Sequence, residues 1–298
     1  MSQKLLFMAL LMLAAVPALL ADEQFSLVMP QWVAQHANDK NIRILDVRLE
    51  QSDYLAAHVP NAVYFQENTV RGPRNGIPVQ YLPSDTIAEL LVRAGVTSDD
   101  SVVLYSDGPA VLGATMVAYA LEKIGHPRVM IMDGGWTAYK AAGLPVTQQY
   151  PTYQNGRLTV KNNTSITATM QDVRNAMGKP GILIIDARPN ALYTGETKAW
   201  MRNGHIPGAI NIDWHTLVDP NNIHKFKPMD QLRQIYTSRG IKGTEDIILY
   251  CGTSREASLE YAVMRHLLRF KKVRLYEGSW TEWSANPNMP IETGNPAK

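Results

Sequence analysis

The chain has 298 residues, and its 29 Lys and Arg against 27 Asp and Glu give a formal net charge of +2. A near-neutral chain of mixed charge has no electrostatic basis for binding nucleic acid or an anionic membrane surface, so we expect neither as a partner. The length fits two domains of ordinary size. With one cysteine and seven scattered histidines, no metal-ligand spacing emerges, and we expect neither a metal nor a cofactor.

The N-terminus has the layout of a secretory signal peptide over residues 1–21. Lys4 supplies a positive lead, Leu5–Leu20 is apolar throughout, and Ala21 precedes the polar Asp22. The apolar run is short for a membrane span, which takes about 20 residues, although an uncleaved anchor is the alternative. We therefore expect export, cleavage after Ala21, and a periplasmic protein without stable membrane association.

Beyond this leader the chain contains the same series of sequence motifs twice. Four sequence blocks recur in the same order: Ile44–Arg48 and Ile184–Arg188, His58–Ala62 and His205–Ala209, Val102–Ser106 and Ile247–Cys251, Asp133–Thr137 and Glu277–Thr281. The ordered matches indicate two copies of one domain, because their spacing is far too long for a solenoid repeat. We predict an N-terminal domain at 22–147, a polar linker at 148–163 and a C-terminal domain at 164–298.

Within each copy, short β-branched runs alternate with helical patterns. In the first copy we predict strands at 42–47, 62–65, 101–106 and 128–132, and helices at 86–94 and 114–124. In the second copy we predict strands at 182–187, 209–212, 246–251 and 273–276, and helices at 229–238 and 257–270. This alternation predicts an α/β fold in which each domain is a mostly parallel sheet flanked by helices. Reactive groups in such sheets lie beyond the C-terminal ends of the strands.

Cys251 falls at such a strand end. It follows the apolar run Ile247–Tyr250 and precedes a small, polar, glycine-containing turn and an amphipathic segment. A strand–Cys–loop–helix arrangement aims backbone N–H groups and the positive end of a helix at the sulfur, and both favour the nucleophilic thiolate. The structural alternative is a small core residue. We favour a reactive cysteine in an electropositive, partly open site, since an exported protein with one cysteine has no second one to pair with it.

Together these blocks resemble the rhodanese sulfurtransferases, in the two-domain arrangement of the thiosulfate and 3-mercaptopyruvate enzymes. The resemblance rests on the Asp-x-Arg strand end, the His-x-Pro-x-Ala turn, the Cys-initiated loop and the Gly-x-Trp block. It implies a catalytic C-terminal copy and a non-catalytic N-terminal copy, in which Ser106 stands in place of Cys251. The implied reaction moves a sulfane sulfur from a small donor onto Cys251 as a persulfide, and then to a thiol or cyanide acceptor or to a thiol-redox protein.

The same resemblance implies roles for residues around the cysteine. The active-site loop consists of Gly252, Thr253, Ser254, Arg255 and Glu256. Its backbone N–H groups would hold the sulfur, helped by a helix starting near Ala257. Hydroxyl groups in and after the loop, up to Ser258, either bind the sulfur or serve the loop itself. Arg188 and Arg202 would bind the anionic group of the donor through their fork-shaped guanidinium groups.

The loop differs from the loop sequences of both enzyme types in this family, and the differences affect which sulfur donor we expect. Thiosulfate enzymes carry basic residues directly after the cysteine, where this chain has Gly252 and Thr253. These small residues are closer to the 3-mercaptopyruvate type, yet Arg255 and Glu256 stand where that type has an apolar residue and a threonine. Arg255 either neutralises an anionic donor, which we favour, or points to solvent paired with Glu256. We expect 3-mercaptopyruvate to be the better donor.

The other repeated residues are expected to be structural. They are Asp46 and Asp186 at strand ends, His58 and His205 in turns, and Trp136 and Trp280 in the core. Two other functional classes compare with a sulfurtransferase. A cysteine-dependent phosphatase needs an Arg six positions after the cysteine, but that position is Ala257. A sulfur or selenium carrier, or a binding module, would use the same loop without turnover.

Overall fold

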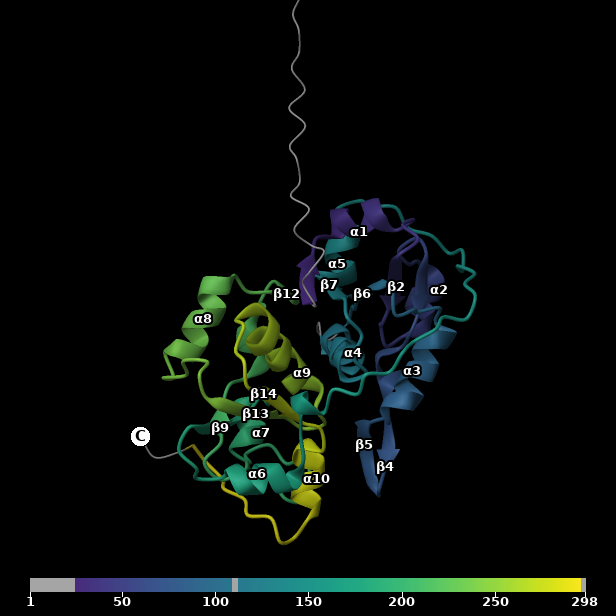
Figure 1. Ribbon diagram of the computed structural model, residues 1–298. Coiled ribbons are helices and arrows are strands. Elements are labelled where there is room, and N and C mark those ends of the chain that lie inside the picture. The colour runs from purple at the N-terminus through teal and green to yellow at the C-terminus, as the bar shows by residue number, and fades with distance from the viewer. Residues whose placement is uncertain (1–24, 109–111, 296–298) are drawn as a thin grey trace, which may run out of the picture.

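The computed structural model describes residues 25–108 and 112–295, so the predicted signal peptide at 1–21 lies outside the described residues. Two α/β domains lie side by side, the N-terminal one coloured purple to teal and the C-terminal one green to yellow (Figure 1). Each domain is built on a five-stranded sheet whose strands are all parallel. The predicted architecture of two tandem domains with parallel sheets is therefore confirmed.

The N-terminal sheet has the strand order β1-β7-β6-β2-β3. In chain order its strands are β1 Phe25–Val28, β2 Ile42–Asp46, β3 Ala62–Tyr64, β6 Ser101–Tyr105 and β7 Val129–Met132. The domain's helices are α1 Pro30–His36, α2 Gln51–Ala56, α3 Ser84–Arg93, α4 Leu112–Lys123 and α5 Gly135–Ala141. Helices α1 and α5 pack on one face of the sheet, and α3 and α4 pack on the other.

The C-terminal sheet repeats this arrangement in the order β10-β9-β13-β14-β8. Its strands are β8 Thr167–Ala168, β9 Ile182–Asp186, β10 Ile210–Asn211, β13 Asp246–Tyr250 and β14 Val273–Tyr276. Its helices are α6 Met170–Ala176, α7 Asn190–Tyr193, α8 Met229–Thr237, α9 Arg255–Tyr261 and α10 Ser279–Ala285. Helices α6 and α10 cover one face, and α8 and α9 cover the other.

The predicted elements are all present, with most ends within two residues of the expected positions. The edge strands β1 and β8 were not among the predicted elements. The helix after the cysteine differs most. It begins at Arg255 rather than near Ala257, and after Tyr261 it continues as a π-helix over Ala262–Leu267. The loop behind Cys251 is therefore shorter than expected.

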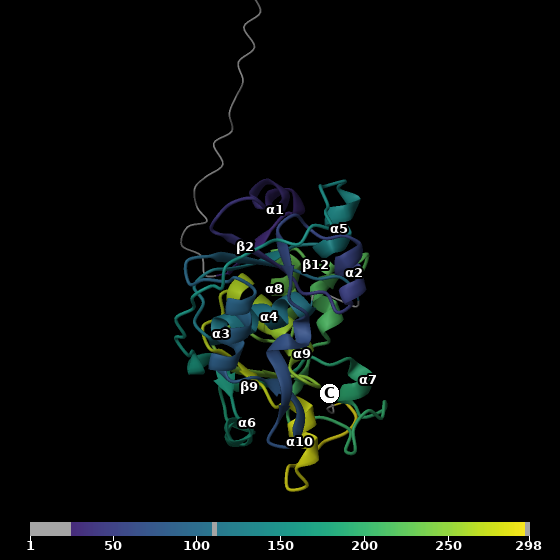
Figure 2. The same cartoon turned by 90° about the vertical axis from the view of Figure 1, so that its right-hand side faces the viewer.

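Helices α4 and α9 pack against each other at the boundary between the two domains (Figures 1 and 2). Every residue of α4 is buried, as expected of a helix enclosed on all sides. Its polar side chains are paired across the boundary. Glu122 accepts hydrogen bonds from Tyr261 at 3.0 Å and from His266 at 2.8 Å, and Lys123 forms a 2.7 Å ion pair with Glu277. One continuous core thus joins the two domains.

Each domain also sends a hairpin to the other domain. The strands of these hairpins are β4 Arg71–Arg74 with β5 Ile77–Tyr81, and β11 Val218–Asp219 with β12 Asn222–Phe226. Hairpin β4–β5 runs beside α10, and Arg71 donates to the carbonyl of Thr253 at 2.7 Å (Figures 1 and 2). Hairpin β11–β12 makes the reciprocal contact, since Gly134 N–H donates to the carbonyl of His224 at 2.9 Å. The hairpin of one copy therefore lies against the active-site end of the other.

A buried Asp–Arg pair lies at the end of β2 in one sheet and at the end of β9 in the other. Arg48 Nε lies 2.9 Å from Asp46 Oδ1, and its Nη2 lies 2.6 Å from Oδ2. Arg188 and Asp186 repeat this geometry at 2.9 and 2.5 Å. Each guanidinium also donates to a carbonyl in or beside the neighbouring His-x-Pro turn, at 2.8 and 2.7 Å. The expected structural role of Asp46 and Asp186 is confirmed.

The repeated Trp and His residues are structural as well. Trp136 and Trp280 are buried, and the guanidinium of the adjacent Asp–Arg pair lies 4.6 Å from each ring. His58 and His205 are buried in their turns, where each stacks on a tyrosine with ring centroids 3.9 and 3.7 Å apart. These contacts account for all four side chains through packing.

Residues 148–163 contain no helix or strand and run along the N-terminal domain. Backbone hydrogen bonds hold this segment in place, from Gly156 N–H to Val92 O at 3.0 Å and from Lys161 N–H to Ile124 O at 2.8 Å. In the part of the chain that the structure describes, no helix is long and apolar enough to cross a membrane.

The Asp–Arg pair generates a stability prediction. Asp186→Ala leaves the guanidinium of Arg188 buried without its anion, and removing one partner of a buried ion pair costs about 3–5 kcal/mol. We expect the free energy of unfolding, measured by urea denaturation, to fall by that amount. Glu89→Ala is the control, because its ion pair with Arg93 is exposed and contributes less than about 1 kcal/mol. Equal losses in the two variants would contradict the prediction.

Candidate active site

Cys251 directly follows β13, at the edge of the sheet where reactive groups were expected. Its N–H lies 3.3 Å from Ser279 Oγ, and its carbonyl accepts a 2.8 Å hydrogen bond from Trp280 N–H. The side chain is fully buried, with 0% exposure. The expectation of a partly open site is therefore wrong, because the loop is closed over by the neighbouring domain and by the start of α10.

The hydroxyl groups of the loop serve the loop itself. Ser254 has a left-handed backbone at φ 64° and its Oγ lies 3.2 Å from Ser279 Oγ. Ser258 donates to the carbonyl of Arg255 at 2.7 Å. The Gly252 carbonyl is held by both the N–H and the hydroxyl of one residue in α10, at 3.1 and 2.9 Å. Of the two roles open for the serine hydroxyls, these bonds support the structural one.

Opposing effects act on the pKa of the Cys251 thiol. Burial raises the pKa of the Cys251 thiol well above its usual value, and the adjacent Glu256 carboxylate raises it further. Hydrogen bonds from the backbone N–H groups of Ala257 and Thr253 lower it. Burial and the carboxylate outweigh these hydrogen bonds, so the net shift of the Cys251 pKa is upward. This direction favours the thiol over the thiolate, whereas the loop sequence alone favoured the thiolate.

Two side chains from the N-terminal domain complete the loop. Arg71 donates to the carbonyl of Thr253 at 2.7 Å, while its second terminal nitrogen binds Asn68 at 2.6 Å. Glu67 forms an ion pair with Arg255 at 2.8 Å. Sequence reasoning missed both, because they lie in a segment of the other copy without a recognisable motif and reach the loop only through domain packing.

Glu67 is held firmly at this boundary. Its side chain is buried and lies against Gly113 of α4, where a Cβ would come within 2.1 Å of the carboxylate. Only glycine leaves room for the carboxylate at this point of the helix. Arg255 therefore forms its ion pair with an anion of the other domain and not with Glu256. Its contact with a donor stays a prediction.

The two arginines that were predicted to bind the donor form hydrogen bonds with other groups of the protein. Arg188 is fully buried by Asp186 and two tryptophans, and one of its terminal nitrogens, Nη1, has no hydrogen-bond partner. Its counterpart Arg48 in the non-catalytic copy makes the same bonds, which favours a structural role. Arg202 donates to the carbonyls of Asn286 and Met289, both at 2.6 Å. Donor binding by Arg188 and Arg202 stays a prediction.

Trp200 forms the outer wall of the loop. Its indole N–H donates to the hydroxyl of Thr281 at 3.1 Å, and a Cβ on Gly252 would come within 2.9 Å of its ring. The glycine after the cysteine therefore permits a close approach of the aromatic ring, which a larger residue would push away. No sequence signal marks Trp200, since the contact joins two distant segments.

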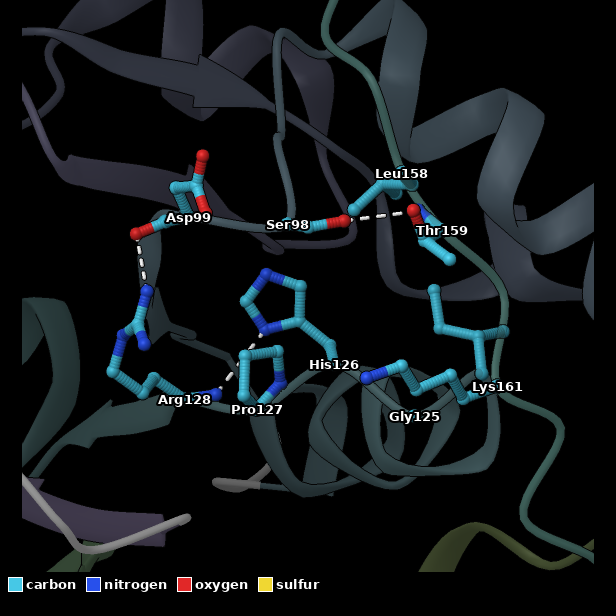
Figure 3. A pocket seen from close by; sticks show the side chains of 10 residues that line it. Ser98, Asp99, Gly125, His126, Pro127, Arg128, Leu158, Thr159 and Lys161 are labelled. Atoms are coloured by element: carbon cyan, nitrogen blue, oxygen red, sulfur yellow. Dashed lines mark hydrogen bonds between the residues drawn. The ribbon is translucent and has the colours of Figure 1, made fainter.

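A separate polar cavity of about 370 Å³ lies in the N-terminal domain beside the linker (Figure 3). Its groups bond to one another. Ser98 Oγ accepts from Thr159 N–H at 2.9 Å, His126 Nε2 lies 3.1 Å from the Thr97 carbonyl, and Arg128 binds the Asp99 carbonyl. None of the residues of the Cys251 loop lines this cavity. In residues 25–108 and 112–295, no cluster of His, Cys, Asp or Glu could hold a metal ion.

Comparisons with known proteins agree with this geometry. A family profile described as "Rhodanese-like domain" matches residues 29–142 and again residues 169–286. The chain is 45% identical over 287 residues to a protein of Synechococcus elongatus named "Putative thiosulfate sulfurtransferase", covering 94% of this chain and 88% of that one.

Two further relatives extend the comparison. The chain is 32% identical to the "Sulfur carrier protein TtuD" of Thermus thermophilus, covering 90% of this chain and 96% of that one. The crystal structure of the 3-mercaptopyruvate sulfotransferase SseA from Escherichia coli superposes with a TM-score of 0.76 at 28% identity, covering 87% of this chain and 99% of that one. The chain therefore belongs to the rhodanese family and carries two rhodanese-like domains.

Proposed function

We propose that this protein is a sulfurtransferase that carries a sulfane sulfur as a persulfide on Cys251. The observation that carries the proposal is the placement of its one cysteine directly after β13, on the loop that leads into α9. Relatives that span nearly the whole chain are named as sulfurtransferases, which supports the same reaction class.

The reaction has two half-steps. The thiolate of Cys251 attacks the outer sulfur of a donor, an S–S bond forms, and the rest of the donor leaves. An acceptor then attacks the outer sulfur of the persulfide: a thiol becomes its own persulfide, or cyanide becomes thiocyanate, and Cys251 is restored. Two N–H donors at the sulfur stabilise its negative charge in both half-steps, and they do so strongly because the site excludes water.

The N-terminal copy supplies structure to this reaction rather than a nucleophile. Ser106 occupies the position of Cys251, and an alcohol carries too little negative charge near neutral pH to attack a sulfur without a general base. The contribution of this copy is its hairpin and the turn before it, which bring Arg71 and Glu67 to the Cys251 loop.

A sulfur or selenium carrier with slow turnover is the second candidate. It is favoured by the relative named as a sulfur carrier and by the complete burial of Cys251, which hinders access of small acceptors. A carrier would take up sulfur once per molecule and release it only to a partner such as a thiol-redox protein. Comparing single-turnover loading of Cys251 with steady-state product formation separates the two functions.

The cysteine generates the central prediction. Cys251→Ala should abolish formation of thiocyanate and of thiol persulfide, because no other residue of the chain can carry the sulfur. Ser106→Ala is the matched control in the other copy and should keep nearly full activity. Steady-state assays and mass spectrometry of the donor-treated protein measure both effects. Substantial transfer by the Cys251→Ala protein would overturn the persulfide mechanism.

The charge balance of the loop generates a prediction about the donor. Thiosulfate is a compact dianion, and the one cation within the loop, Arg255, is already paired with Glu67. A missing charge-assisted hydrogen bond costs about 1.5–3 kcal/mol. We therefore expect kcat/KM to be about tenfold or more higher for 3-mercaptopyruvate than for thiosulfate, measured with one shared thiol acceptor.

Two variants sharpen this test. Glu67→Gln releases the cation of Arg255 and should raise kcat/KM for thiosulfate, whereas Arg255→Ala should lower it further. A clear preference for thiosulfate that survives Arg255→Ala would show that the loop charge does not select the donor.

The N-terminal leader generates a prediction about location. We propose that the protein is exported to the periplasm and cleaved after Ala21, because residues 1–21 have the charge, apolar core and small final residue of a signal peptide. Fractionation should recover a soluble protein whose N-terminal sequence begins at Asp22. Recovery of the full-length chain in membranes after a high-salt wash would argue for an uncleaved anchor.

A further inference from the structure

The two copies differ in length between the strand-end arginine and the His-x-Pro turn. Arg48 precedes His58 by ten positions in the first copy, whereas Arg188 precedes His205 by 17 positions in the second. The additional residues belong to the copy that carries the cysteine. Both copies build the same parallel sheet and the same buried Asp–Arg pair, so the fold itself does not require the longer connection. Its presence in the cysteine-bearing copy indicates a role at the active site.

Trp200 is the residue of this connection that turns toward the protein. We call residues 194–204, between α7 and the His205 turn, the Trp200 loop, and they contain no helix or strand. Residues 196–199 are exposed, and Met201 is 98% exposed. Trp200 lies between them in the chain, yet its side chain is half-buried and packs against the core of the C-terminal domain. An exposed loop thus places a large aromatic ring on the protein surface beneath it.

The backbone around Trp200 is held by hydrogen bonds within the loop. The side-chain oxygen of Asn203 accepts from the N–H groups of Ala199 and Trp200, both at 3.0 Å. The side-chain nitrogen of Asn203 donates to the carbonyl of Trp200 at 2.7 Å. Asparagine commonly fixes a turn by bonding to nearby backbone groups in this way. The ring can therefore change position by rotation of the side chain, while the turn that carries it stays in place.

The indole covers the residue that follows the nucleophile. A Cβ on Gly252 would lie 2.9 Å from the ring, so the ring lies directly against this glycine. The indole N–H donates to Thr281 Oγ1 at 3.1 Å, and the same hydroxyl donates to the Gly252 carbonyl at 2.9 Å. Gly252 is buried and Cys251 has no exposed surface, whereas Trp200 is partly exposed. The ring therefore lies between this part of the loop and solvent.

The cysteine-bearing copy has one more aromatic ring at this place than the other copy. Among the described residues, two rings lie within about 6 Å of the Arg48 guanidinium, which is the range of a cation–π contact. The equivalent two rings lie near Arg188, and Trp200 lies there in addition, at 5.5 Å. The extra ring accompanies the nucleophile and not the fold.

Other contacts of the Cys251 loop are harder to open. The Cys251 carbonyl accepts a 2.8 Å hydrogen bond from the backbone of α10, and Arg255 forms its 2.8 Å ion pair with Glu67 of the other domain. Helix α4 is buried along its whole length where it packs on α9. Breaking these contacts would separate helices or whole domains. The indole of Trp200 is held by one hydrogen bond between neutral groups, which contributes little net stability.

We propose that Trp200 is a specificity-determining residue that limits the size of the sulfur donor reaching Cys251. Its indole rotates away from Gly252 to admit a donor, and the space that it releases accepts only a compact molecule. The proposal rests on the proposed sulfurtransferase function and adds a donor class to it. That class consists of small donors, such as thiosulfate and 3-mercaptopyruvate, and excludes sulfur attached to an aromatic group.

Two thiosulfonates of equal charge test the donor class. With methanethiosulfonate or benzenethiosulfonate, the Cys251 thiolate bonds to the outer sulfur, the S–S bond of the donor breaks, and a sulfinate leaves with its electron pair. The two donors differ in the size of the group beside the reacting bond. We expect Trp200→Ala to raise kcat/KM for the benzene compound relative to the methane compound by about tenfold or more, since hydrophobic sites discriminate a single methylene by about 10–200-fold.

Alkylation provides a second readout that needs no turnover. The chain has one cysteine, so mass spectrometry of the alkylated protein reports on Cys251 alone. N-ethylmaleimide is bulkier than iodoacetamide. We expect Trp200→Ala to react about tenfold or more faster than wild type with the maleimide, and to gain less with iodoacetamide, for the same steric reason.

Met201→Ala is the matched control, because Met201 is the next residue of the same loop and its side chain lies in solvent. It should leave the donor preference and both alkylation rates unchanged. Trp200→Phe keeps an aromatic ring but loses the hydrogen bond to Thr281, and it should lie between wild type and Trp200→Ala. An unfolded Trp200→Ala protein would react with both reagents at the rates of the urea-denatured chain, and Trp200→Phe then decides the test.

Two outcomes would overturn the proposal while leaving the sulfurtransferase function intact. One is a folded Trp200→Ala protein with the donor preference and alkylation rates of wild type. The other is an equal change in Met201→Ala, which would assign the effect to the loop as a whole. Absence of turnover by the wild-type protein with every donor would instead overturn the proposed function, and the alkylation rates would still show whether Trp200 controls access to Cys251.

Discussion

The closure of the Cys251 loop between two domains is the constraint on which the rest of the site depends. The fully buried helix α4 packs on α9, and hairpin β4–β5 of the N-terminal domain lies against the loop from the other side. This packing removes water from the sulfur. In a dry site each charge and each N–H group acts more strongly, and the thiolate becomes harder to form.

The two copies show what the fold needs and what the chemistry needs. Both keep the Asp–Arg pair at the strand end, with nearly equal distances, and both keep the Trp beside it. These contacts stabilise the sheet edge whether or not a nucleophile follows. The copies differ in the loop itself, where Ser106 stands in one and Cys251 in the other. Reciprocal exchange of hairpins explains how a copy without a nucleophile still shapes the active site.

Two adjacent loop residues of opposite charge do not form an ion pair with each other. Arg255 and Glu256 could have paired with each other, since they are neighbours at the start of α9. Instead Arg255 reaches across the domain boundary to Glu67, which lies buried against Gly113. Arg255 thereby becomes part of the domain interface, and Glu256 does not. Helix geometry makes this division natural, because consecutive residues point about 100° apart around the axis.

The amino-acid sequence by itself determined the duplication, eight of the ten strands in the two five-stranded sheets, and the position of Cys251 at a strand end. These follow from short-range patterns: apolar runs of strand length, repeated blocks and the residue types at strand ends. Tertiary structure alone decided the burial of the sulfur and the partners of the arginines. Glu67 and Arg71 meet the loop from more than 180 residues away in the chain, and no local pattern encodes such a contact. The direction of the Cys251 pKa shift likewise depends on desolvation, which is a property of packing between domains and not of the loop sequence.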